Sequence, residues 1–483
     1  MARNIGVNAI LNVIKTSLSV LFPLITYPYI SRVLGVENLG KVNYAVIFVS
    51  YFSTLAALGI SAYAVREGSK LRENKESLIK LGSQLFSINL LSMFVAYFLL
   101  ILITFTFIEN SEYQKLILLQ SLVILFTTLS IDWINVLYED FLYITIRTIV
   151  IQICSLIALF VFVKTSGDIY YYIFLSVVAS GLSCLLNFFY CRRYFRLRLT
   201  CQLDLKKHFR KIFTLFLGAI LISIYVNSDV IFIEKFNGIY YVGIYVIAVK
   251  IYAVLRTIFS AIYYVAIPKL SNFSANNRFD DFKSLYTKLV SYLLLILLPV
   301  STGIFILSKN IVLFMGGKDY IEAIPVLQIF SISIIGAILG GLLTSALNVS
   351  LGKESISLKG AIYAVLLNIT LNIILVPNFM HIGAAISITF TEFFIFFYNY
   401  FVVSECREYI DKNTVYRNFY QSVLGCIAIG ILAIYLNSLN LSPLLESTIL
   451  VCSSVILYFG VLAMLRNTLF MEVKSIIIRK VSS

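Results

Sequence analysis

The chain has 483 residues, of which 60% are hydrophobic and 13% are charged, and its net charge is +14 at pH 7. A soluble globular protein carries about 25% charged residues, and a mean hydropathy of +0.93 is too high for a chain folded in water. The composition therefore excludes a soluble globular protein and predicts an all-α polytopic membrane protein, since each crossing needs about 20 apolar residues in a helix.

Apolar runs of that length recur along the whole chain, and they predict about fourteen transmembrane helices. The connections between them are too short for a separate soluble domain. The predicted spans are residues 7–31, 42–64, 82–108, 116–137, 144–163, 170–190, 212–233, 240–264, 286–308, 323–347, 357–377, 382–403, 418–437 and 444–465.

Lys and Arg gather in the even-numbered connections, above all in CRRYFRLRLTCQLDLKKHFRK (191–211). Cytoplasmic loops of membrane proteins hold the excess of Lys and Arg, so this bias predicts that both termini are cytoplasmic. The same bias accounts for the positive net charge, which therefore does not indicate a nucleic-acid partner. At most it favours contact with anionic lipid head groups.

The first predicted connection, GVENLGKV (35–42), resembles a phosphate-binding P-loop, whose pattern is G-x-x-x-x-G-K-[ST]. The last position is Val42, which cannot ligate magnesium, and the segment joins two spans on the predicted external side, where ATP is absent. This part of the sequence therefore does not predict an ATPase.

The same connection recurs later in the chain. ISRVLGVENLGKVNYA (30–45) aligns with IEKFNGIYYVGIYVIA (233–248), and Gly35 and Gly40 fall on Gly238 and Gly243. The two copies begin at the first and seventh spans, so they run in the same direction, as in transporters built from parallel repeats. The repeat predicts an N-terminal lobe of six spans (1–211), a second six-span lobe (212–417) and two additional C-terminal spans (418–483).

Ionisable and amide side chains lie inside several spans, where such a residue usually faces a cavity or a partner. The interior cations, which are expected to line the substrate path, are Lys15, Lys250 and Arg256. The candidate coupling or charge-pair carboxylates are Asp132, Asp229 and Glu392. The residues expected to line a polar cavity are Asn8, Asn12, Asn227, Asn368 and Asn372. Interior cations suit an anionic cargo, because a phosphate needs countercharge in a medium of low dielectric constant.

Helical spacing supports part of this set. Asn8, Asn12 and Lys15 fall on one face of the first span, and Asn368 and Asn372 are four residues apart. Asp132 and Glu139, seven residues apart at the end of the fourth span, are likewise expected to share a face. No spacing of Cys and His suggests a metal site, and no cofactor is predicted. Three glycines in the tenth span indicate close helix packing: Gly336, Gly340 and Gly341.

Each of these assignments has a structural alternative. Lys15 could form a salt bridge to another span, and Asp229 could be a coupling-ion site or the partner of Lys250. Arg256 could extend to the cytoplasmic interface, and Asp132, near a helix end, could be an interfacial anchor. The asparagine pairs could be interhelical hydrogen bonds.

Several motifs together resemble one family, the Wzx-type flippases for lipid-linked polysaccharide repeat units. These proteins form the polysaccharide transporter branch of the multidrug/oligosaccharidyl-lipid/polysaccharide exporter superfamily. The resemblance covers about the first two-thirds of the chain, and beyond about residue 360 it is mostly one of hydropathy. It is carried by PYISRVLGVENLGKVNYA (28–45), LGISAYAVRE (58–67), DWINVLYEDFLYITIR (132–147), VNSDVIFIEKFNGIYYVGIYVIAVKI (226–251), AIPKLSNF (266–273) and GGKDYIEAIPVLQI (316–329).

This resemblance implies a multi-pass protein of the bacterial inner (plasma) membrane that moves an undecaprenyl-diphosphate-linked oligosaccharide from the inner to the outer leaflet. Transport would serve O-antigen or capsule assembly, by alternating access coupled to an ion gradient and without ATP. Membrane lipid, a polysaccharide polymerase and assembly proteins are the implied partners. Carried over by the motifs are Asp132, Trp133, Asn227 and Asp229, together with Glu139 and Arg147 as candidates for a cytoplasmic gate.

Two other functions compete with this one. A multidrug exporter, or an exporter of another lipid-linked substrate in the same superfamily, would share the fold; a drug-cation exporter would be expected to depend on acidic cavity residues. A membrane glycan polymerase or ligase would use the same lipid-linked substrate, but such enzymes usually carry a sizeable external loop. The longest external connection lies around 309–322, and it offers few residues suited to an active site. The sequence therefore predicts a transporter, not an enzyme.

Overall fold

The computed structural model describes residues 5–439, 443–472 and 475, and for residues 5–14, 17, 205–207 and 443–444 it describes the backbone alone. Every regular element in this part of the chain is helical, as the composition predicts. The helices form two compact units, residues 1–246 and 247–483. The lobe boundaries expected from the repeat remain a prediction.

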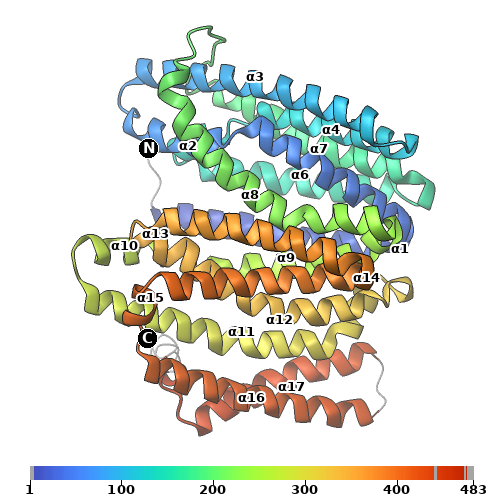
Figure 1. Ribbon diagram of the computed structural model, residues 1–483, viewed down its shortest axis with the longest axis vertical. Coiled ribbons are helices and arrows are strands. Elements are labelled where there is room, and N and C mark those ends of the chain that lie inside the picture. The colour runs from blue at the N-terminus through green and yellow to red at the C-terminus, as the bar shows by residue number, and fades with distance from the viewer. Residues whose placement is uncertain (1–4, 440–442, 473–474, 476–483) are drawn as a thin grey trace. The chain divides into compact units, whose positions relative to one another are not determined.

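The first unit is built around one long helix, α1 (Ile5–Ala57), which packs against α3, α4, α6 and α8. Figure 1 shows these helices in blue to green. The helices of this unit are α1, α2 (Ile60–Lys70), α3 (Lys75–Phe107), α4 (Ser111–Thr128), α5 (Asp132–Leu137), α6 (Phe141–Phe162), α7 (Ile169–Cys191), α8 (Leu205–Asn237) and the start of α9 (Ile239–Tyr264).

The second unit is organised along α11, which packs against α12 and α16, while α12 packs against α14 and α16 against α17. Its helices, yellow to red in Figure 1, are the rest of α9, α10 (Ile267–Ala275), α11 (Phe279–Met315), α12 (Ala323–Gly341), α13 (Asn348–Ser350), α14 (Glu354–Val402), α15 (Glu405–Glu408), α16 (Lys412–Ser438) and α17 (Pro443–Met464). A π-helical segment, Leu342–Leu347, joins α12 to α13.

Twelve helical segments of the described chain are long and apolar enough to cross a membrane. Two of them are too long for one crossing, since a helix spans about 30 Å of hydrocarbon with about 20 residues. α1 has 53 residues and a non-helical Gly35, and α14 has 49 residues and a non-helical Met380. Each kinked helix has the length for two crossings. The count of fourteen and the cytoplasmic termini remain predictions.

The repeated glycine connection has the same backbone shape in both copies. Gly35 interrupts α1 with φ 75° and ψ 175°, and Gly238 separates α8 from α9 with φ 92° and ψ 171°. Both φ angles are positive, a backbone conformation that would strain any residue with a side chain. Because the first copy lies inside a kinked helix rather than after a strand, it has no P-loop architecture. Its lysine, Lys41, instead forms a salt bridge of 2.8 Å with Glu112 at the start of α4.

The second glycine of each copy packs against the other copy. A methyl group at Gly40 would collide with the carbonyl oxygen of Ile239, and one at Gly243 would collide with the carbonyl oxygen of Val36. Val36 and Ile239 are themselves equivalent, since each follows the first glycine of its repeat. The contact is therefore reciprocal. The repeat is an internal interface at which two helix ends approach so closely that only glycine fits.

We predict that Gly40→Ala and Gly243→Ala each destabilise the protein by about 1–3 kcal/mol, because the added methyl group must push against a backbone carbonyl. Thermal unfolding of the purified protein in detergent measures the effect. Gly218→Ala is the matched control, since Gly218 lies inside α8 with no atom within 4 Å of the added group. That control should be neutral or slightly stabilising. Equal melting of all three variants would contradict the reciprocal contact.

Candidate functional site

Three charged side chains of the described residues, histidines apart, are almost completely buried: Arg147, Asp229 and Glu392, with 7%, 1% and 2% exposure. A buried charge is costly unless a partner compensates it, and in a membrane protein such residues mark functional interiors. Each of the three has at least one polar partner on another helix. These partnerships define the candidate site residues within each unit.

Glu392 lies on α14 and accepts two contacts from α9. Arg256 forms an ion pair with it at 3.1 Å, and the hydroxyl of Tyr252 donates a hydrogen bond to the same oxygen, Oε1, at 3.1 Å. The ring of Tyr252 stacks on Phe330 of α12, with 4.8 Å between centroids. Three helices of the second unit therefore meet at one carboxylate. Arg256 and Glu392, predicted separately as a cation and a carboxylate, neutralise each other.

Glycines of α12 allow this approach. Additional methyl groups at Gly336 and Gly340 would press on the backbone of α14 at Glu392 and its neighbours, and one at Gly341 would press on the hydroxyl of Tyr263. The close packing predicted for these three glycines is confirmed. Their small size brings the polar segment of α14 against α12 and α9.

Asp229 lies on α8 in the first unit. The hydroxyl of Tyr245, on the first turns of α9, donates a hydrogen bond to Asp229 Oδ2 at 2.7 Å. Asn227 lies two residues earlier and is half-buried. Asp229 as a partner of Lys250 and Asp229 as a coupling-ion site both remain predictions.

Lys15 and Lys250, the other predicted interior cations, are both half-buried. Lys15 lies on α1 and forms no ion pair with a described residue. Asn8 and Asn12 lie on the same helix, but their side chains are outside the part that the structure describes. A half-buried ammonium group without a neighbouring carboxylate is suited to an anionic ligand.

The motif around Asp132 forms two separate ion pairs. Arg147 of α6 contacts Asp132 of α5 at 3.1 Å, and Arg72 contacts Glu139 at 3.0 Å. A common face for Asp132 and Glu139 requires a continuous helix, but α5 ends at Leu137 and Glu139 has φ 58°. The chain turns there, so the two carboxylates take different arginines. Gating by Glu139 and Arg147 remains a prediction.

Asn368 and Asn372 are both fully buried on α14, and the amide of Asn372 donates to Oδ1 of Asn368 at 3.1 Å. Spacing placed them on one helical face, and the hydrogen bond follows from that spacing. The bond lies within one helix, so this contact does not itself link two spans.

Sequence reasoning missed the tyrosines that accompany the interior carboxylates. Tyr245, Tyr252, Arg256 and Tyr263 follow one another on α9 at spacings of seven, four and seven residues, which places them on one helical face. That periodicity was a signal for a polar stripe. It is obscured in the sequence because tyrosine is abundant, with 32 copies in the chain.

The described arrangement can bind small cations or protons at its carboxylates and anions at its cations. Among the described residues, no three His, Cys, Asp or Glu side chains are grouped so that they could hold a metal ion.

Comparison with known proteins agrees with this picture. A family model described as polysaccharide biosynthesis protein matches residues 3–274. The capsular polysaccharide biosynthesis protein CapF of Staphylococcus aureus is 23% identical over 370 residues, which cover 74% of this chain and 88% of CapF.

Solved structures show the fold. The lipid II flippase MurJ, in an inward closed conformation, superposes with a TM-score of 0.75 at 17% identity, over 95% of this chain and 99% of MurJ. An inward-facing multidrug resistance transporter of the MATE family, in the MOP superfamily, gives a TM-score of 0.62 at 13% identity, over 82% of this chain and 99% of the transporter. The chain thus has the fold of membrane transporters.

We predict that Arg256→Met destabilises the protein by on the order of 2 kcal/mol, since it leaves Glu392 buried without its cation. The double variant Arg256→Met/Glu392→Leu should recover most of this loss, because neither charge of this ion pair then remains. Thermal unfolding in detergent measures both. Arg72→Met, which breaks the exposed pair with Glu139, is the control and should cost less than about 1 kcal/mol. A double variant less stable than Arg256→Met would contradict the pairing.

Proposed function

The chain belongs to the polysaccharide biosynthesis protein family, and from this premise we propose that it is a flippase for a lipid-linked oligosaccharide. It is a multi-pass protein of the bacterial plasma membrane with the fold of MurJ and of MATE transporters. We infer that it moves an undecaprenyl-diphosphate-linked repeat unit from the inner to the outer leaflet, for assembly of a capsule or an O-antigen.

The observation that carries this proposal is the cation Lys15. It is half-buried on the first long helix, and no described carboxylate neutralises it. A diphosphate brings the charge that such a cation needs at low dielectric constant. The sugars of the cargo are too polar to cross hydrocarbon unaided, whereas the prenyl tail is itself apolar and can stay in the lipid.

The interior carboxylates supply the proposed coupling. Asp229 and Glu392 each accept a hydrogen bond from a tyrosine, and a carboxylate so placed can exchange a proton or a small cation as its surroundings change. Alternating access of the two predicted lobes would then be driven by an ion gradient.

The alternative within the same fold is an exporter of small amphipathic cations. The family match and the relative CapF favour a polysaccharide precursor over a drug, and Lys15 favours an anionic over a cationic cargo. An enzyme acting on the same precursor is disfavoured, since the solved structures that share the fold are transporters.

The experiment that tests the proposal is depletion of the protein in the bacterium, followed by measurement of the lipid-linked oligosaccharide on each leaflet. The expected result is accumulation of complete single repeat units on the cytoplasmic leaflet, with loss of surface polysaccharide. Accumulation on the outer leaflet would place the block at polymerisation or ligation instead. Unchanged surface polysaccharide together with sensitivity to cationic drugs would favour the multidrug exporter.

We predict that Lys15→Gln lowers surface polysaccharide at least about tenfold in complemented cells, while Lys15→Arg retains most of it, because the arginine keeps the charge. A charge-assisted contact contributes about 1.5–3 kcal/mol, which corresponds to tenfold or more. Lys115→Gln is the matched control, since Lys115 is exposed and forms no ion pair with a described residue. All variants are compared at equal protein level in the membrane. Normal export by Lys15→Gln would remove Lys15 from the cargo path.

A further inference from the structure

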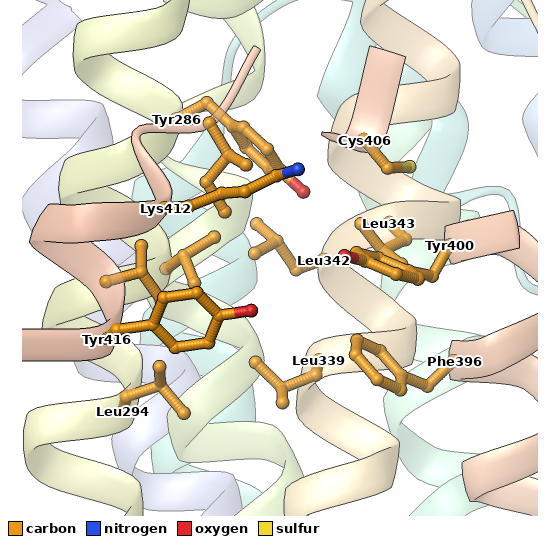
Figure 2. A pocket seen from close by; sticks show the side chains of 13 residues that line it. Tyr286, Leu294, Leu339, Leu342, Leu343, Phe396, Tyr400, Cys406, Lys412 and Tyr416 are labelled. Carbon is orange, nitrogen blue, oxygen red and sulfur yellow. The ribbon is translucent and has the colours of Figure 1, made fainter. Parts of the chain in front are cut away.

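A pocket of about 160 Å³ lies inside the second unit, between α11, α12, α14 and α16. Figure 2 shows its apolar wall, formed by Leu294, Leu339, Leu342, Leu343 and Phe396. Water gains few hydrogen bonds beside an apolar surface, so this wall favours an apolar occupant.

A few polar groups also line the pocket. The hydroxyls of Tyr400 and Tyr416 point into it from opposite sides, and the side chains of Tyr286 and Lys412 also line it (Figure 2). Tyr286 is only 2% exposed, yet its hydroxyl has no hydrogen bond to a described residue. A hydroxyl without a partner in the protein can hydrogen-bond to a polar group of a molecule bound in the pocket.

Lys412 likewise forms no ion pair with a described residue, although carboxylates lie close in sequence. Asp411 caps α16 by accepting a hydrogen bond from the backbone of Asn413, and Glu405 pairs with Lys353. Burial raises the pKa of the Cys406 thiol in the pocket to about 12, so this group stays neutral. The ammonium group is thus available to an anion from outside the protein.

The pocket lies at the level where membrane helices begin and end. Lys412 is the first residue of α16, and Cys406 belongs to the short helix α15 between α14 and α16. Tyrosines and lysines favour the interface between hydrocarbon and water, where lipid head groups are found. The orientation predicted from the loop charges makes this the cytoplasmic interface, where basic pockets between helices bind anionic lipid head groups.

We propose that this pocket binds an anionic phospholipid of the surrounding membrane, with its phosphate at Lys412 and Tyr286 and the first segment of one acyl chain on the leucine wall. The single ammonium group matches the single negative charge of a phosphodiester. A diphosphate would bring more negative charge than this pocket neutralises. The bound lipid would hold α16 against α11 and α14, joining the two C-terminal helices to the rest of the unit.

Lipid binding to the purified full-length protein in detergent tests this site, with phosphatidylglycerol as the anionic probe and phosphatidylcholine as the zwitterionic one. Native mass spectrometry reports the apparent Kd of each. Wild type should bind phosphatidylglycerol at least about tenfold more tightly than phosphatidylcholine. Lys412→Gln should abolish that preference, and Tyr286→Phe, which removes only the hydroxyl, should weaken phosphatidylglycerol binding about tenfold.

The matched control is Lys359→Gln, since Lys359 is an exposed cation in the first turns of α14 without an ion pair to a described residue and does not line the pocket. It should bind both lipids as wild type does. Leu343→Trp, which fills the pocket, should lose phosphatidylglycerol binding. If this variant does not fold, Lys412→Gln and Tyr286→Phe test the proposal, since each changes the size of its side chain little. Equal binding by wild type, Lys412→Gln and Tyr286→Phe would overturn the proposal. So would tighter binding of undecaprenyl diphosphate than of phosphatidylglycerol.

Discussion

The arrangement of the helices depends on one constraint: a charge inside hydrocarbon must be compensated within the protein. Glu392 satisfies it with Arg256 and Tyr252, and Asp229 with Tyr245. In both cases the partner comes from α9. Hydrophobic burial cannot align membrane helices, because lipid tails are as apolar as leucine. Polar contacts of this kind therefore specify how the neighbours of α9 are oriented within each unit.

Small residues are the second feature that aligns the helices, and the repeat shows that they are required at particular positions. At Gly40 and Gly243 the reciprocal contact leaves no room for a methyl group, and at Gly336 the backbone of α14 also comes close to α12, though less so. Dispersion and close backbone packing replace the hydrophobic effect at such positions. This explains why the repeat preserves its two glycines while Lys41 is replaced by Ile244 in the second copy. The lysine only reaches Glu112, a contact specific to the first copy.

Hydropathy and glycine spacing were sufficient to predict an all-helical membrane protein and the position of the repeated turn, since both depend on local sequence. The pairing of Arg256 with Glu392 was not predictable, because the two residues lie 136 positions apart in the sequence. The spacing of Asp132 and Glu139 predicts a shared helical face only where the helix is continuous. The helix ends between them, so each carboxylate pairs with a different arginine. An aspartate near a helix end carries no local sign of where the chain will turn.

The charges of the chain fall into two classes with different consequences. Paired groups such as Arg256 and Glu392 are neutral together, so they stabilise the fold and can respond to a proton or an ion only if the pair separates. Lys15 and Lys412 are without a carboxylate among the described residues, and one lies within a long apolar helix and the other beside a leucine-lined pocket. A cation in such a setting gains most from an anion that also carries an apolar chain. The amphiphilic anions proposed for the two positions would differ in how long they stay: a small pocket with one ammonium group would retain a resident lipid, whereas a transported head group must leave again and so requires weaker, exchangeable contacts.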